Sequence, residues 1–294
     1  MAKRVASTPP VLAGYSYVRP LGSGGFADVF LYEQDMPRRV AAVKVLLSDV
    51  VGPEVLRTFN AEAAISARLS AHPSIVTIYH ASISADGRPY FAMEYCPTTM
   101  SSKYKKHPLP LDEVLDAGVR IAGALETVHR AGLLHRDIKP SNILINSLGA
   151  PVLGDFGIAT AIADDDAGDA IAMSVPWSAP EVLSERVTGS VPSEVWSLGA
   201  TLYTLLAGHS PFELPDRADN SRERLTARIR KAKYTPVPVA GIPPVVEQVL
   251  ATAMHRDPAQ RFPSMAAFAD RLRWAQYESG LVPSAFEAAS AEWA

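Results

Sequence analysis

The chain has 294 residues and a mass of 31.6 kDa, a length that allows one large domain or two small ones. Apolar residues make up 48% of it and charged residues 20%, a mixture that supports a sizeable core and excludes a disordered or low-complexity chain. The formal net charge of −3 argues against nucleic acid as a partner, because duplex binding needs a basic face. The single cysteine, Cys96, excludes an intramolecular disulfide framework and a cysteine-rich zinc site, and it fits a reducing compartment.

The N-terminal segment is not typical of a secretory signal, because Lys3 and Arg4 are not followed by a continuous apolar stretch. No segment reaches the roughly 18 to 20 uninterrupted apolar residues that a membrane span needs. The nearest candidate, residues 195–208, is interrupted by hydroxyl side chains and predicts a buried helix. We therefore expect a cytoplasmic chain without a membrane span, which can also be one module of a longer or membrane-anchored protein.

Short alternating or β-branched runs dominate from residue 15 to residue 93 and predict strands at residues 15–20, 28–32, 40–46, 75–83 and 90–94. Residues 53–69 interrupt them with apolar side chains at helical spacing and Pro53 in the first turn, which predicts one helix. Beyond residue 97, amphipathic helices are expected at residues 111–131, 191–206, 244–255 and 264–277. The sequence therefore predicts an α+β chain with a small sheet-rich part and a larger helical part, joined near residues 94–100.

A glycine-rich stretch, Gly-Ser-Gly-Gly-Phe-Ala-Asp-Val at residues 22–29, lies between two predicted strands. Glycines allow a tight hairpin to bring its backbone N–H groups close to phosphate oxygens, although such a stretch alone is more often a plain hairpin. A dinucleotide-binding turn is excluded, because that motif opens onto a helix and here a strand follows. Lys44 ends the apolar segment of the next strand, where an ordinary lysine is an exposed, solvated residue. If Glu62 formed an ion pair with it, Lys44 would instead be held where it can bind phosphate.

The most informative stretch is Leu-His-Arg-Asp-Ile-Lys-Pro-Ser-Asn at residues 134–142, which places a carboxylate, an ammonium and an amide in one loop. Phosphoryl transfer needs such a set: Asp137 orients the attacking hydroxyl and accepts its proton, Lys139 offsets γ-phosphate charge, and Asn142 holds a metal. Asp155, which opens an Asp-Phe-Gly sequence, is a second candidate metal ligand. A plain charged surface loop would require two independent coincidences, so the pattern favours phosphoryl transfer.

These motifs and their order resemble the eukaryotic-like (Hanks-type) serine/threonine protein kinases of bacteria. The resemblance implies a bilobal protein-kinase fold over residues 15–278. It has a small β-rich N-terminal lobe with one main helix (15–93), a hinge (94–97) and a larger helical C-terminal lobe (98–278). Residues 279–294 would form a tail or linker. The implied cofactors are ATP and Mg²⁺ (or Mn²⁺), and the implied partners are protein substrates with Ser/Thr acceptors, with an N-lobe homodimer as a further possibility.

The resemblance also implies an ATP site between the lobes, with the glycine hairpin over the phosphates, apolar side chains around the purine and a hinge that bonds adenine through its backbone. Its residues are Leu21, Gly22, Ser23, Gly24, Gly25, Phe26, Val29, Ala42, Lys44, Met93, Glu94, Cys96 and Leu144. Among them Met93 stands at the gatekeeper position, and Cys96 is expected to be a small hinge residue rather than a reactive thiol. His72 and His135 are expected to be structural rather than a ligand and a base.

Three further residues match the activation segment and substrate platform of the family: Arg136, Ser174 and Glu181. The Ser174 hydroxyl is expected to bridge Asp137 and Lys139. Glu181, in an Ala-Pro-Glu sequence, is expected to pair structurally with Arg261. Lys139 stands two residues after Asp137, a pattern that resembles serine/threonine-specific rather than tyrosine-specific kinases.

Two residues depart from the family pattern near the implied site. Ala27 replaces the third glycine of the nucleotide hairpin, and we expect a modest loss of ATP affinity at most. Glu194 stands where the family usually has an aspartate that braces the backbone of the catalytic loop. Its additional methylene must be absorbed by a shift of the helix or of its hydrogen bonds.

The activation segment departs further. Arg136 resembles the arginine that pairs with a phosphorylated loop, yet Thr160 is the only hydroxyl residue between Gly157 and Ser174. The loop centre instead carries four aspartates, Asp164, Asp165, Asp166 and Asp169. One of them pairs with Arg136 in place of phosphate, or the loop is simply a solvated acidic segment.

Two other functions remain to be distinguished from an active protein kinase. A pseudokinase or ATP-binding scaffold with little catalytic activity is disfavoured, because the set Lys44, Glu62, Asp137, Lys139, Asn142 and Asp155 is complete. A small-molecule phosphotransferase of the same fold is disfavoured by Lys139 and by the Ala-Pro-Glu platform for peptide substrates.

Overall fold

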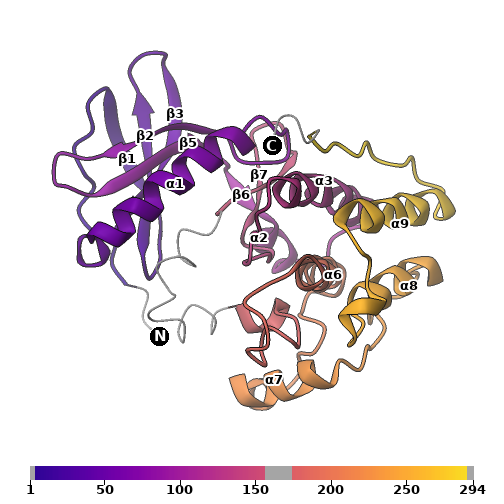
Figure 1. Ribbon diagram of the computed structural model, residues 1–294. Coiled ribbons are helices and arrows are strands. Elements are labelled where there is room, and N and C mark those ends of the chain that lie inside the picture. The colour runs from indigo at the N-terminus through magenta and orange to yellow at the C-terminus, as the bar shows by residue number, and fades with distance from the viewer. Residues whose placement is uncertain (1–3, 156–173, 290–294) are drawn as a thin grey trace.

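The computed structural model describes residues 4–155 and 174–289; within helix α1 the side chains of residues 54, 58, 61, 62, 64 and 66 lie outside the description. A five-stranded antiparallel sheet with one long helix forms the N-terminal lobe, and a helical C-terminal lobe lies beside it (Figure 1). This is the expected bilobal arrangement. Among the described residues, no helix has both the length and the apolar character needed to cross a bilayer.

The N-terminal sheet has the strand order β1-β2-β3-β5-β4. Its strands are β1 (Tyr15–Ser23), β2 (Ala27–Gln34), β3 (Arg39–Leu46), β4 (Ile78–Ile83) and β5 (Pro89–Glu94). Side chains alternate between its two faces. On one face Leu46 and Phe91 pack against Phe59 of helix α1 (Pro53–Leu69), and on the other Phe30 and Tyr32 belong to a separate apolar cluster.

The fourth strand begins three residues later than expected. Residues 75 and 76 are apolar and β-branched, which favours a strand, but they pair with the C-terminal lobe instead. Ile75 forms a parallel bridge with Leu153, and the Val76 amide donates to the Leu153 carbonyl at 2.9 Å. The turn after α1 is therefore built into the C-terminal lobe.

The C-terminal lobe packs its helices around one large apolar core. The four helices expected here are α3 (Leu111–Arg130), α6 (Val191–Ala207), α8 (Pro244–Ala253) and α9 (Met265–Glu278). A small sheet is formed by β6 (Thr98–Thr99), β7 (Ile143–Ile145) and β8 (Pro151–Leu153), and β7 directly follows the loop of residues 134–142. Helix α6 begins at a capping box between Ser190 and Ser193 and ends at Gly208, whose φ of 78° only glycine adopts without strain.

Two helices were not predicted, α2 (Met100–Tyr104) and α7 (Arg222–Lys231). The first has five residues, too few for a periodic signal. The second buries only Leu225 and Ile229, so tertiary contacts rather than an apolar stripe hold it in place. Short 3₁₀ turns complete the described fold: η1 (Ser48–Val50), η2 (Val175–Trp177), η3 (Arg217–Asn220) and η4 (Pro258–Gln260).

Candidate active site

The glycine hairpin forms the turn between β1 and β2. The Gly24 amide donates to the Ala27 carbonyl at 2.9 Å and closes the turn. A Cβ atom added at Gly22 or Gly25 would meet no atom within 4 Å, so a phosphate can approach this backbone closely. Ala27, which replaces the third glycine, packs its methyl group against the apolar cluster that contains Leu46, Phe59 and Phe91.

The strand register places the candidate ATP-binding side chains on one face of the sheet. Val29 lies opposite Lys44, and Ala42 lies opposite Met93. Cross-strand partners in an antiparallel pair point to the same side, and so do residues two apart along a strand, so these four share a face. Cys96 follows β5; its burial and the nearby Glu94 carboxylate raise the pKa of the thiol to about 12. The thiol is therefore protonated and unreactive at neutral pH.

Lys44 connects the two lobes through an ion pair. Its ammonium lies 2.8 Å from Oδ1 of Asp155, which follows β8 in the other lobe. The Lys44 charge is the main cause that holds the pKa of Asp155 below its usual value, so the carboxylate is ionised. Asp155 has a φ of 58°, an unfavourable backbone conformation that a functional position can retain. The expected pair between Lys44 and Glu62 involves a side chain outside the described set and stays a prediction.

Asp137 is the centre of a hydrogen-bonded cluster in the C-terminal lobe. The Ser174 hydroxyl donates to its Oδ1 at 2.5 Å, and the Lys139 ammonium lies 2.6 Å from its Oδ2. Lys139 also donates to Ser174 at 3.1 Å, so the serine bridges the two residues as expected. Burial raises the pKa of Asp137, but the charge of Lys139 and the hydrogen bonds from Lys139, Ser174 and Asn142 outweigh it and leave the pKa lowered.

Asn142 and Asp155 provide oxygens that suit a divalent cation. The Asn142 amide nitrogen donates to the backbone carbonyl and to Oδ2 of Asp137, at 2.8 and 2.9 Å, which directs its Oδ1 away from Asp137. Hard cations such as Mg²⁺ prefer carboxylate and amide oxygens and keep only one or two protein ligands when phosphate supplies others. No cluster of three or more His, Cys, Asp or Glu ligands occurs in the described parts of the chain.

Glu194 braces the backbone just before Asp137. Its Oε1 accepts from the Arg136 amide at 2.5 Å, and its Oε2 lies 2.6 Å from Nε2 of His129 near the end of α3. Arg136 has a φ of 65°, which costs about 1 to 2 kcal/mol for a residue with a Cβ. The longer glutamate therefore reaches both groups from α6, and the brace that the family aspartate provides is present.

Comparisons with known proteins agree with this geometry. The family model described as the protein kinase domain matches residues 15–272. The chain belongs to the protein kinase family.

Curated relatives indicate which type of protein kinase the chain resembles. The serine/threonine-protein kinase PknK of Mycobacterium bovis is 39% identical over 275 residues, which cover 92% of this chain and 24% of the relative. PrkC of Bacillus subtilis is 32% identical over 84% of this chain and 38% of its own length, and PknB of Mycobacterium leprae is 33% identical over 95% and 45%. The sequence is thus of the eukaryotic-like serine/threonine kinase type found in bacteria. The chain spans about a quarter of the length of the PknK relative and under half of the other two.

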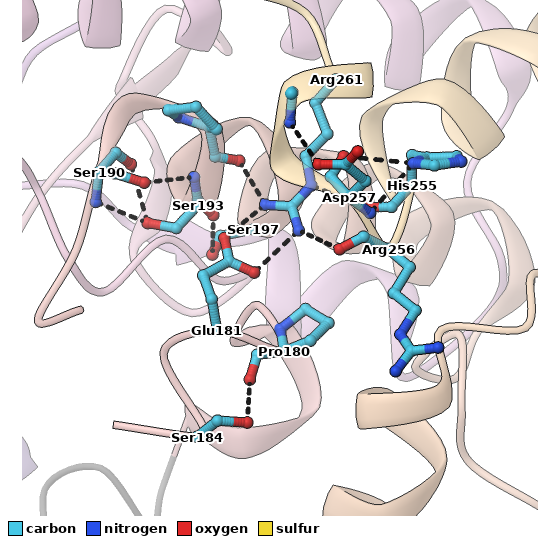
Figure 2. Close-up of polar contacts among 12 residues, drawn as sticks. Pro180, Glu181, Ser184, Ser190, Ser193, Ser197, His255, Arg256, Asp257 and Arg261 are labelled. Carbon is cyan, nitrogen blue, oxygen red and sulfur yellow. Dashed lines mark hydrogen bonds and ion pairs between the residues drawn. The ribbon is translucent and has the colours of Figure 1, made fainter. Parts of the chain in front are cut away.

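Glu181 and Arg261 form a buried ion pair (Figure 2). The guanidinium donates to both carboxylate oxygens, at 2.6 and 2.9 Å, and its side chain is fully buried. It also donates to the carbonyls of Pro192 and His255, and it lies 5.0 Å from the centre of the Trp196 ring. These contacts leave neither group facing a substrate, in keeping with a structural role.

His135 packs inside the loop that carries Asp137. Its Nε2 lies 3.0 Å from the Gly154 carbonyl, and its Nδ1 accepts from the Asp137 amide at 3.3 Å. Only 1% of the residue is exposed. It therefore joins the two backbone segments that carry Asp137 and Asp155, and it is not placed to act as a base.

Sequence reasoning missed one contact of the site, and another of its hypotheses concerns residues that the structure does not describe. His129 was missed; a histidine in the last turn of an amphipathic helix is an ordinary feature, and its partner lies on a distant helix. The hypothesis that an acidic residue pairs with Arg136 falls on residues 164–169, outside the described chain. On the described side, Arg136 lies against Gly189 in a small cavity also lined by Thr188 and Ser193.

Proposed function

We propose that this chain transfers the γ-phosphoryl group of ATP to serine or threonine hydroxyls of protein substrates. The cluster formed by Asp137, Lys139 and Ser174 is the observation that carries the proposal. It combines an ionised carboxylate with a fixed ammonium, the pair that an attacking hydroxyl and a transferring phosphoryl group require.

Asp137 is suited to orient the acceptor hydroxyl. Ser174 occupies one site on its Oδ1, and a carboxylate oxygen has two lone-pair sites, so a second donor can bind there. A lowered pKa makes Asp137 a weak base, and this suits a reaction whose transition state is loose and needs little early proton transfer. The carboxylate positions the hydroxyl and takes its proton late.

Lys139 and Lys44 supply fixed positive charge on the two sides of the reaction. Lys139 is held by Asp137 and Ser174, so its ammonium is oriented before a phosphoryl group arrives. Lys44 lies on the sheet face that carries the candidate purine contacts. Its present contact, Asp155, is the carboxylate proposed to bind metal.

A divalent cation, Mg²⁺ or Mn²⁺, fits the oxygens of Asn142 and Asp155. When bound there with nucleotide phosphates it would neutralise phosphate charge. We further propose that the enzyme acts in the cytoplasm. We also propose that two N-terminal lobes can pair as a homodimer, and sedimentation of the purified chain would test this pairing.

Phosphorylation of a protein acceptor tests the activity directly. The purified chain is incubated with labelled ATP, Mg²⁺ and casein, and the labelled amino acids are identified. We expect phosphoserine or phosphothreonine, and a loss of about 10² to 10⁴-fold in Asp137→Asn. Asp112→Asn, an exposed carboxylate at the start of α3, is the matched control and should keep the wild-type rate.

Two outcomes would contradict the assignment. Equal labelling by the wild type and Asp137→Asn would show that another group carries the reaction. No labelling by a wild-type chain that binds ATP would instead support a nucleotide-binding scaffold, the alternative that the complete set of site residues disfavours.

A further inference from the structure

The segment after α9 turns back over the C-terminal lobe. Gly280 ends the helix with a φ of 73°, and the Leu281 amide donates to the Gln276 carbonyl at 2.9 Å. Residues 281–289, which we name the strap, then run from the end of α9 across α3 toward the N-terminal lobe (yellow in Figure 1). Phe286 and Leu281 pack against the core of the C-terminal lobe.

Ser284 fixes the first half of the strap. Its amide donates to Oε1 of Gln276 at 2.8 Å, and its hydroxyl accepts from the same side-chain amide at 2.8 Å. The hydroxyl also donates to Asp116 on α3 at 2.7 Å, and the carbonyl accepts from Arg273 at 3.1 Å. Since Gln276 is 98% buried, this contact belongs to the interior of the fold.

Gly123 fits the second half of the strap against α3. A Cβ atom at this position would lie 2.1 Å from the Glu287 carbonyl oxygen, a distance that no real contact allows. Glycine is unfavourable inside a helix relative to alanine, so its presence here matches the close approach of another backbone. One turn further, Thr127 accepts from the Ala289 amide at 3.0 Å, and Arg130 donates to the Ala289 carbonyl at 3.0 Å.

The same Glu287 carbonyl contacts the turn that follows α1. Nε2 of His72 lies 2.9 Å from it, and Nδ1 of His72 accepts from the Ser74 amide at 3.0 Å, so the neutral ring satisfies both contacts. The His72 amide in turn donates to the carbonyl of Leu69, the last residue of α1. One carbonyl of the strap therefore connects α3 to the end of the helix that carries Glu62.

We propose that the strap is an intramolecular positioning element of this kinase domain. Docked between α3 and His72, it holds the turn after α1 in place and so sets the position of α1 and of Glu62. Gly123 and His72 are positioning residues in this scheme, since neither contacts a reacting group. The kinetic part of the proposal rests on the proposed kinase activity, whereas the structural part does not.

Gly123→Ala in the full chain tests the proposal, because the added methyl group collides with the strap backbone. Hydrogen exchange should become at least about ten-fold faster at the strap amides of Ser284 and Ala289 and also in the turn, at Ile75 and Val76. The kcat for phosphoryl transfer should fall several-fold while the KM for the protein acceptor stays unchanged. Phe286→Ala, which weakens the strap without altering α3, should reproduce both effects.

Gly118→Ala is the matched control. It is the same substitution on the same helix, but its Cβ atom would meet side chains of Leu202 and Leu272 and not the strap. In Gly118→Ala, hydrogen exchange at Ile75 and Val76 in the turn after α1 should rise no more than in the rest of the C-terminal lobe.

Faster exchange in the strap with unchanged exchange in the turn would refute the coupling. Unchanged exchange at both places in Gly123→Ala would refute the steric fit. An inactive wild-type chain that still shows the exchange pattern would overturn the proposed function and leave the strap assignment standing.

Discussion

Replacing Glu194 by aspartate, the residue usual at this position in the family, is expected to destabilise this protein. The Glu194 carboxylate accepts from the Arg136 amide and contacts His129 on another element, at 2.5 and 2.6 Å. Aspartate is one methylene shorter, about 1.5 Å of reach. Because its two contacts belong to the catalytic loop and to α3, the shorter side chain cannot satisfy both unless α6 moves.

The magnitude follows from the burial of these groups. The side chains of Glu194 and His129 are 3% and 7% exposed, so solvent does not replace a lost contact. A hydrogen bond to a charged group contributes about 1.5 to 3 kcal/mol and a neutral one about 1 kcal/mol. We expect a loss of about 1 to 3 kcal/mol for Glu194→Asp and Glu194→Gln. Glu194→Ala leaves two buried donors and a cavity, and should cost about 3 to 6 kcal/mol.

Urea unfolding measures these differences. With a slope of about 3 kcal/mol per molar, the midpoint should fall by about 0.3 to 1 M for the first two variants and by about 1 to 2 M for Glu194→Ala. Arg136 precedes Asp137, the proposed catalytic residue, so kcat should fall by about 10 to 100-fold, whereas the KM for ATP should change little. Glu278→Gln, an exposed residue at the end of α9, is the control and should alter neither quantity.

Wild-type stability and kcat in Glu194→Asp would refute this reasoning, because they would show that α6 adjusts freely to the shorter side chain. Equal losses in the aspartate and alanine variants would also contradict it.

Two further changes have defined outcomes. Glu181→Gln leaves the fully buried Arg261 guanidinium without its counter-charge and should lower the free energy of unfolding by about 3 kcal/mol in urea melts; a loss below about 1 kcal/mol would show that the backbone carbonyls suffice. Burial lowers the pKa of His72 below 6.5 despite its bond to the Glu287 carbonyl, so the unfolded chain binds more protons than the folded one and stability should fall as the pH drops below about 6.5. His72→Asn should show a weaker fall between pH 7.5 and 5.5, and an unchanged pH dependence would contradict the assignment.

The sequence was sufficient where a function depends on residues close together in the chain. Asp137, Lys139 and Asn142 lie within one loop, so their spacing alone indicated a phosphoryl-transfer site, and Ser174 was added by the family resemblance. The predicted strands and long helices were also found, with ends that differ by a few residues, because alternating and helical periodicities reflect burial on one face.

The sequence failed where partners are distant. Helix α7 carries too few apolar residues for a signal, and the contact of His129 with Glu194 joins two helices that only the fold brings together. Nothing in the sequence singles out Gly123; only the structure places the Glu287 carbonyl against it.

Length and composition allowed one domain or two, and the family resemblance carried by the motifs and their order implied a kinase domain with two lobes. The tertiary structure decided how those lobes are connected. The Lys44–Asp155 ion pair, the bridge of Ile75 to Leu153 and the strap at His72 are contacts between residues far apart in sequence. Local propensity and periodicity carry no information about such pairs, because their formation depends on the packing of whole elements.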